Sequence, residues 1–296
     1  FKEIADKLYN SAFTDSDAIL QDDCSMQAIS PCLIFTPETI LKNINQDLRT
    51  HYTDIYDLSK KIDDDRTARF QALIKHKFSD RVLIALLDLF ESRKDDEQIN
   101  NFVTDNADIP TIFEYILGII WYKISENKGS ILDFMKLSLD ANLLPKSHAV
   151  GGGADIIYMY DKTKDYPQHT VLLEATLTNK TNQRRAEMEP VSRHLGEYLL
   201  AHKNDNSYCV FLTNYLDLNV ISDFRGRKEY TYYSADGQSF IKGMKIIPLQ
   251  VSDIKNILVN NIIYKHLYLI FDNAYHSQKE IRFWYQETIS NEILKS

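Results

Sequence analysis

The segment from Gly151 to Tyr198 constrains the fold more than any other part of the chain. It contains two short apolar runs, DIIYMY and TVLLEATL, whose length and β-prone composition are typical of strands. The residues between them, Asp161 to Pro167, are polar and typical of a turn. These features predict a hairpin whose register brings Asp155, at the start of the first run, next to Glu174 in the second.

A carboxylate inside an apolar strand needs compensation. An unpaired buried charge is costly, so Glu174 is expected to be paired, hydrogen-bonded or bound to a metal. Two carboxylates that meet at a strand end are ligands that Mg²⁺ prefers, and such an ion stabilises charge on a phosphate and lowers the pKa of a bound water. The pair therefore indicates phosphodiester hydrolysis. The alternative is an ordinary strand pair with one exposed acid and one salt-bridged acid.

The residues that follow resemble a known family. The order Gly-Ala-Asp, Glu-Ala-Thr and then RRAEMEPVSRH (184–194) resembles the catalytic region of the AlwI-like type IIS restriction endonucleases, a group that includes nicking enzymes. The resemblance implies the PD-(D/E)xK nuclease fold, an α/β architecture with a mixed central sheet flanked by helices. It also implies a deoxyribonuclease of a restriction-modification system that cleaves double-stranded DNA with Mg²⁺, for which Mn²⁺ substitutes.

The resemblance also assigns five site residues. Asp155 and Glu174 correspond to the metal-binding carboxylates, Glu187 to a further acid at the metal, and His194 to a histidine near the cleft. Glu114, in the apolar helical run IPTIFEYILGIIWYKI, corresponds to an acid on an upstream helix. The residues alone leave two alternatives open. Glu114 is also stabilised by the positive end of a helix dipole, and a histidine on an apolar face is commonly a core residue.

One position departs from the fold signature. The signature has a lysine two residues after the glutamate, and this chain has Thr176 there. Lys180 or Gln183 takes over the positioning of water, or no lysine is used.

Pro190 lies in the helical pattern and either begins a helix or kinks one, because proline cannot donate a helix hydrogen bond. If the helix begins earlier, Glu187 and His194 lie two turns apart on nearly the same face, ~10 Å along the axis. At that separation they do not share one metal ion.

The chain divides into two predicted parts. Residues 1–105 show helical spacing and are expected to form a helical subdomain or a linker to a DNA-reading domain. Within them TPETILKNINQDL begins with Thr36 as N-cap, and Lys60 to Arg66 and Arg93 to Gln98 are expected breaks between helices. Residues 106–296 are expected to form the nuclease domain.

The rest of the nuclease domain has a simple pattern. Asp108 or Asn106, followed by Pro110, is expected to open the helix that carries Glu114. SYCVFLTN and MKIIPLQV are expected strands, which gives the order helix, strand, strand, helix, strand for the core. VSDIKNILVNNIIYKHLYLIFDNAYH has a helical pattern, and YTYYSADG is an expected hairpin that lies near DNA or simply packs.

The net charge of −8 argues against tight binding of nucleic acid, because phosphate contacts need Lys and Arg. Local clusters are a better guide, and Arg184, Arg185 and Arg193 beside the acidic stretch are expected to bind DNA; the alternative is a solvated surface. The acidic balance indicates that recognition comes from another domain. A single site cuts one strand, so a double-strand break needs a second nuclease subunit.

The sequence also bears on location and on other functions. No apolar stretch reaches the ~20 residues of a membrane helix, and the three cysteines fit a reducing, cytoplasmic setting. The chain begins with Phe1 rather than methionine, which indicates a piece of a longer protein. Two alternatives stay open: a non-catalytic or partner-dependent DNA-binding subunit, for which Thr176 is the argument, and a repair or mobile-element nuclease of the same fold.

Overall fold

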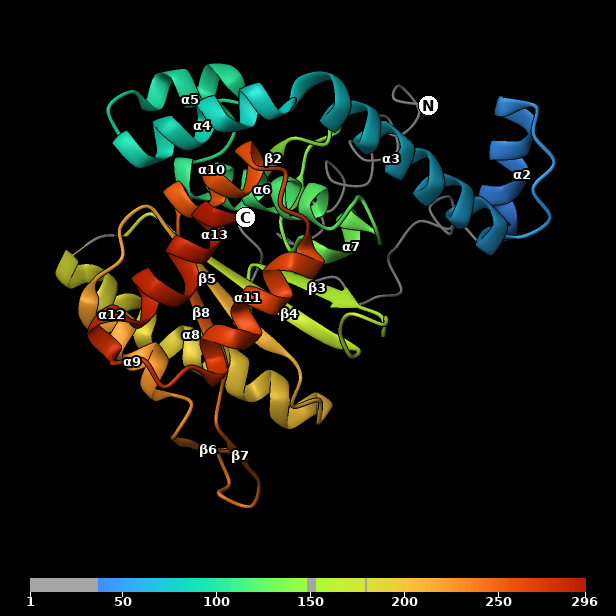
Figure 1. The fold of residues 1–296 in the computed structure, drawn as a ribbon. Coiled ribbons are helices and arrows are strands. Elements are labelled where there is room, and N and C mark those ends of the chain that lie inside the picture. Colours follow the sequence, from blue (N-terminus) through green and yellow to red (C-terminus); the bar gives the residue numbers. More distant parts are fainter. Residues whose placement is uncertain (1–36, 148–152, 179) are drawn as a thin grey trace, which may run out of the picture. The chain divides into compact units, whose positions relative to one another are not determined.

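The structure is a computed structural model, and it describes residues 37–147, 153–178 and 180–296 (Figure 1). The chain forms two compact units, residues 1–69 and 70–296. Their boundary lies within one helix, α3 (Ile55–Lys77). The expected division into domains after residue 105 stays a prediction, although the helices just before that residue belong to the second unit.

The described part of the first unit consists of α2 (Pro37–Leu48) and the first turns of α3. The helix expected over TPETILKNINQDL is confirmed from Pro37 onward, and its expected N-cap, Thr36, lies outside the described residues. Asn45 fixes the connection to α3, because its side chain donates to Tyr52 O and accepts from Tyr52 N, both at 2.9 Å.

The break expected at Lys60 to Arg66 is wrong, because these residues lie inside α3. Lysine and arginine are good helix formers, so a run of charges does not end a helix by itself. Lys61 and Asp65 form an i,i+4 ion pair at 3.0 Å, which adds a small stabilisation to the exposed helix.

The second unit begins with three helices, α4 (Asp80–Ser92), α5 (Asp96–Phe102) and α6 (Ile109–Ile124). The second expected break is shorter than predicted, since α5 already begins at Asp96. The expected start of α6 is confirmed: Asp108 is the N-cap, and its side chain accepts a hydrogen bond of 2.9 Å from Thr111 N. Nearly all of α6 is buried, as its apolar sequence predicts.

A four-stranded mixed sheet forms the centre of this unit, in the order β3-β4-β5-β8 (Figure 1). The hairpin of β3 (Ile156–Tyr160) and β4 (His169–Thr176) is antiparallel, as expected. β5 (Tyr208–Thr213) and β8 (Ile246–Gln250) run parallel to β4 and are the strands expected from SYCVFLTN and MKIIPLQV. The fold is therefore α/β with a mixed sheet and flanking helices.

Helices cover both faces of the sheet. On one face lie α8 (Lys180–His202) and α9 (Leu218–Gly226), where the Phe211 and Phe224 rings pack 5.2 Å apart. On the other face lie α6 and α11 (Tyr264–His276), where Tyr160 stacks on Tyr264 with 3.7 Å between ring centroids. Strand side chains alternate between the faces, so the hairpin residues divide between these two helical layers.

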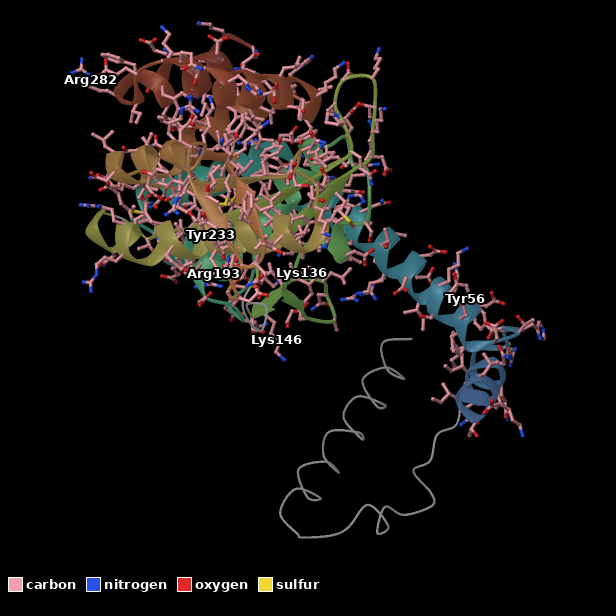
Figure 2. The ribbon with its side chains drawn as sticks, turned by 90° about the horizontal axis from the view of Figure 1, so that it is seen from below. Tyr56, Lys136, Lys146, Arg193, Tyr233 and Arg282 are labelled. Atoms are coloured by element: carbon pink, nitrogen blue, oxygen red, sulfur yellow. The ribbon has the colours of Figure 1, made fainter. Side chains whose placement is uncertain are left out.

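The remaining elements are short. They are α7 (Ile131–Phe134), β1 (Ser138–Leu139), β2 (Pro145–Ser147), α10 (Val251–Val259), α12 (Ile281–Tyr285), a π-helical turn (Gln286–Ser290) and α13 (Asn291–Lys295). The expected hairpin of YTYYSADG is confirmed as β6 (Thr231–Tyr233) and β7 (Phe240–Lys242), with Tyr233 exposed (Figure 2). Within the described residues, no helix has the length and apolarity needed to cross a membrane.

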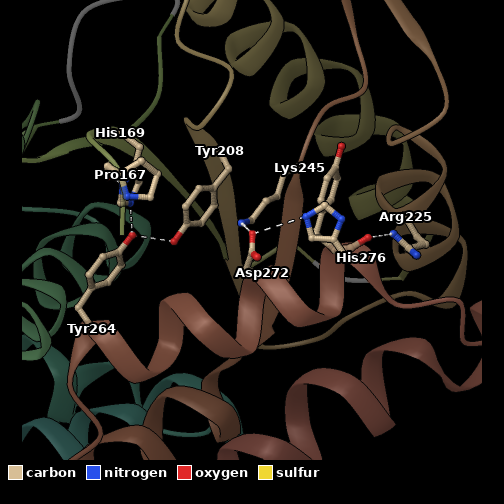
Figure 3. Close-up of polar contacts among 9 residues, drawn as sticks. Pro167, His169, Tyr208, Arg225, Lys245, Tyr264, Asp272 and His276 are labelled. Carbon is tan, nitrogen blue, oxygen red and sulfur yellow. Dashed lines mark hydrogen bonds and ion pairs between the residues drawn. The ribbon is translucent and has the colours of Figure 1, made fainter. Parts of the chain in front are cut away.

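A buried polar cluster lies between the sheet and α11 (Figure 3). His169, at the start of β4, is 1% exposed, and its Nδ1 lies 2.7 Å from Pro167 O. Its Nε2 is hydrogen-bonded to the Tyr264 hydroxyl, which lies 2.8 Å from the Tyr208 hydroxyl. A carbonyl only accepts, so Nδ1 carries the proton and Nε2 accepts from Tyr264. Burial lowers the pKa of His169 to about 4.

Candidate active site

The structure brings Asp155 and Glu174 together. Ile156 pairs with Leu173, so the preceding residue Asp155 lies opposite Glu174 on the same face of the hairpin. The backbone N–H of Ala175 donates to Asp155 Oδ2 at 2.8 Å, which fixes the aspartate at the end of β4. The register predicted from the sequence is therefore confirmed. The pair lies at the carboxyl edge of the parallel strands, where open α/β sheets bind ligands.

Glu174 and His194 form a buried hydrogen-bonded pair. His194, on α8, places Nδ1 2.8 Å from Glu174 Oε1, and only 12% and 9% of the two side chains are exposed. Burial raises the pKa of Glu174, and the hydrogen bond with His194 offsets part of that effect. The same hydrogen bond raises the pKa of His194. The pairing compensates the charge that the apolar strand would otherwise leave alone.

Glu187 also lies on α8, whose first turn faces the edge of the sheet where β4 and β5 end. It is half-buried, and burial raises its pKa, while hydrogen bonds with the Thr176 and Thr178 hydroxyls work in the opposite direction. Thr176 therefore contacts the acidic cluster at the position where the fold signature has lysine. α8 begins ten residues before Pro190, so this proline lies inside the helix and does not begin it.

Glu114 approaches from α6, in the other helical layer. It is 6% exposed, and burial, together with the charges of Asp108 and Glu174, raises its pKa to about 8. Burial also raises the pKa of Asp155, and the charges of Glu114 and Glu174 add to this. The four predicted acids thus form one electrostatically coupled group, and their mutual repulsion is the property that a bound cation relieves.

The predicted basic residues all lie on α8, and Arg193 is half-buried. Arg184 and Arg185 are exposed. Arg193 (Figure 2) forms an i,i+4 ion pair with Glu189 at 3.0 Å. These positions are compatible with DNA contacts, and their role stays a prediction.

Gln183 has a role that the sequence did not reveal. It is fully buried, and its Nε2 donates to Thr213 Oγ1 at 2.9 Å and to Thr178 O at 3.1 Å, while Oε1 accepts from Asp217 N at 2.9 Å. The amide therefore ties the first turn of α8 to the ends of β4 and β5. These contacts engage both ends of the amide and argue against a role in positioning water. The side chain of Lys180, the other candidate, lies outside the described residues.

The donor set fits a hard cation with few protein ligands. Among the described residues, no three His, Cys, Asp or Glu side chains are grouped so that together they hold a metal. Mg²⁺ does not require three, because it keeps several waters and is held by one or two carboxylates and by substrate phosphates. The hydrogen bonds above use Asp155 Oδ2 and Glu174 Oε1, so the second oxygen of each carboxylate remains for such an ion.

Comparison with known proteins gives the family. The model of the AlwI restriction endonuclease family matches residues 1–257 of the 296. The chain belongs to this family. The family resemblance inferred from the catalytic region is thereby confirmed, and membership of the AlwI family supports a role as a DNA endonuclease.

A solved structure is also similar to this chain. The chain is similar to the crystal structure of the small subunit (R.BspD6I2) of the heterodimeric restriction endonuclease R.BspD6I, at 20% identity and a TM-score of 0.46. The match covers 71% of this chain and 95% of that one. No curated protein matches this member of the AlwI family.

Proposed function

We propose that this chain is a Mg²⁺-dependent endonuclease of the type IIS class, with a PD-(D/E)xK core, that hydrolyses phosphodiester bonds of double-stranded DNA. The observation that carries the proposal is that Asp155 lies opposite Glu174 at the end of β4, with Glu187 and Glu114 near enough for their charges to raise the pKa of Asp155. Burying four acids together is unfavourable without a cation, so a purely structural role gives no reason for the arrangement.

Asp155 and Glu174 would hold the ion, and Glu187 and Glu114 would support it. When bound, Mg²⁺ stabilises negative charge on the phosphate and lowers the pKa of a water. His194 holds the Glu174 carboxylate by its hydrogen bond at Oε1, which would leave the other oxygen for the ion. Arg184, Arg185 and Arg193 would contact DNA phosphates outside the acidic group.

Cleavage of the second strand and recognition of DNA would be supplied from outside this site. One acidic group cuts one strand, so a double-strand break needs a second nuclease subunit. The net charge of −8 supports a separate DNA-recognition domain, because the described site offers few cations for phosphate contacts.

Cleavage of supercoiled DNA tests the proposal. The purified chain is incubated with Mg²⁺, with Mn²⁺ or with EDTA, beside Glu174→Gln and the matched control Glu197→Gln, an exposed glutamate of α8. We expect metal-dependent nicking, a loss of about 100-fold or more in Glu174→Gln, and little change in Glu197→Gln. Equal activity of the two variants would refute the assignment.

A non-catalytic or partner-dependent subunit is the second candidate, and Thr176 in the lysine position favours it. Calorimetric titration with Mg²⁺ separates a non-catalytic subunit from the proposed nuclease, whereas a partner-dependent nuclease binds the ion and is identified by cutting that requires its partner. A subunit without turnover has no reason to bind the ion, whereas the proposed nuclease binds it and loses binding in Asp155→Asn.

A further inference from the structure

The acidic group raises a problem of charge. Hydrolysis of a phosphodiester brings a negatively charged phosphate beside four carboxylates and increases the charge on its oxygens. A positioned cation is the usual means of stabilising such charge. Two described basic side chains of α8 lie close by, but His194 is hydrogen-bonded to Glu174 and Arg193 is paired with Glu189. The source of a further cation is therefore an open question.

Lys136 lies directly beside Asp155. The segment after α7 extends the sheet beyond β3 through an antiparallel bridge between Met135 and Ile156. One residue further along, the N–H of Lys136 donates to Asp155 O at 3.2 Å. The register therefore places Lys136, Asp155 and Glu174 in one row across three neighbouring segments of the sheet.

The alternation of side chains determines the face on which Lys136 lies. Met135 and Ile156 are buried, and both lie against Gly118 of α6. Successive residues of an extended segment point to opposite faces, so Lys136 and Asp155 are directed to the face covered by α8. This is the face that carries Glu174 and His194.

The side chain of Lys136 is available. It is exposed (Figure 2), and its ammonium makes one long hydrogen bond of 3.3 Å to Asp133 O. Neighbouring strands lie ~4.8 Å apart, and the four-carbon stem of lysine spans a distance of this order. The side chain is therefore long enough to bring its ammonium in front of Asp155 once it leaves the carbonyl.

We propose that Lys136 is a catalytic residue whose ammonium binds a non-bridging oxygen of the phosphate that is cut. The inference rests on the proposed endonuclease function and adds to it the cation that position 176 does not supply. Lysine suits this role because its ammonium is a compact point charge that binds phosphate.

Single-turnover cleavage with enzyme in excess tests the role of Lys136. The variants are Lys136→Gln, Lys136→Arg and the matched control Lys146→Gln, which removes an exposed lysine from β2. We expect the cleavage rate to fall about 100-fold or more in Lys136→Gln. Arginine should restore part of the rate, and Lys146→Gln should remain near wild type. Binding of DNA in EDTA should change by about fivefold or less in each variant, since one exposed charge contributes little.

Four outcomes would overturn the inference. A cleavage rate for Lys136→Gln within about threefold of wild type would exclude a catalytic role, because the loss of a catalytic cation is expected to slow cleavage far more. Equal losses in Lys136→Gln and Lys146→Gln would indicate general attraction of DNA. A larger loss in a fourth variant, Lys180→Gln, would assign the cation to Lys180. If wild type cuts DNA and Glu174→Gln does not, the proposed function is supported, and the results for the lysine variants test the role of Lys136 alone. Absence of cutting by wild type overturns the proposed function together with this inference.

Discussion

The buried His169 should make the protein less stable in mild acid. Burial lowers its pKa from the ordinary 6.5 to about 4. Between these values the unfolded chain binds a proton that the folded chain does not, so the free energy of unfolding falls as the pH falls from about 6.5 to about 4. Protonation of Nε2 would also oppose the hydrogen bond that this nitrogen accepts from Tyr264 (Figure 3).

The magnitude follows from the two pKa values. The proton that His169 binds only in the unfolded chain lowers the free energy of unfolding by about 2 kcal/mol at pH 5 and by almost nothing at pH 7. The acids of the candidate site act in the opposite direction, because their raised pKa values favour proton binding by the folded chain. The wild-type pH dependence therefore mixes both effects, and only a comparison with a variant isolates His169.

Urea denaturation at pH 7 and pH 5 measures the effect in wild type and in His169→Gln. Wild type should lose about 2 kcal/mol more than the variant between the two pH values. Tyr166→Phe is the matched control, since its ring lies 5.5 Å from the His169 ring and the substitution leaves the imidazole in place. An equal loss in wild type and His169→Gln would refute the reasoning.

Two further predictions concern the contacts of α8. Gln183→Leu removes the amide that accepts from Asp217 N and donates to Thr178 O. It should therefore lower the free energy of unfolding by about 1 to 3 kcal/mol in urea denaturation. An unchanged value would show that these contacts are dispensable. His194→Phe removes the hydrogen bond to Glu174 and should slow cleavage by about 10 to 100-fold, whereas His194→Gln retains a donor and should lose less. Equal losses in these two variants would indicate that the hydrogen bond does not orient Glu174.

The hairpin and its carboxylates could be predicted because the signals are local. The two apolar runs, the polar turn between them and the position of each acid determine the register without reference to the rest of the chain. The N-cap at Asp108 is equally local, since capping depends on residues within one turn.

Other features depend on residues far apart in sequence. Gln183 binds groups from the ends of two strands, and nothing in its immediate neighbours indicates this. Lys136 stands nineteen positions before Asp155, in a segment with no strand pattern, and only the bridge to β3 places it beside the acid. The run of charges from Lys60 to Arg66 suggests a break, but lysine and arginine have high helix propensity, so the helix continues through it.

The spacing of contacts along α8 limits how its sequence can change in length. Gln183, Glu187, His194 and Tyr198 all face the sheet, and the last of them donates to Thr170 Oγ1 at 2.9 Å. Each added residue turns the remainder of a helix by about 100°. One insertion between Glu187 and His194 would therefore turn His194 and Tyr198 away from their strand partners together. Apart from the arginines proposed to contact DNA, the outer side of this helix is less constrained in residue type, whereas the number of residues between its inner contacts is fixed.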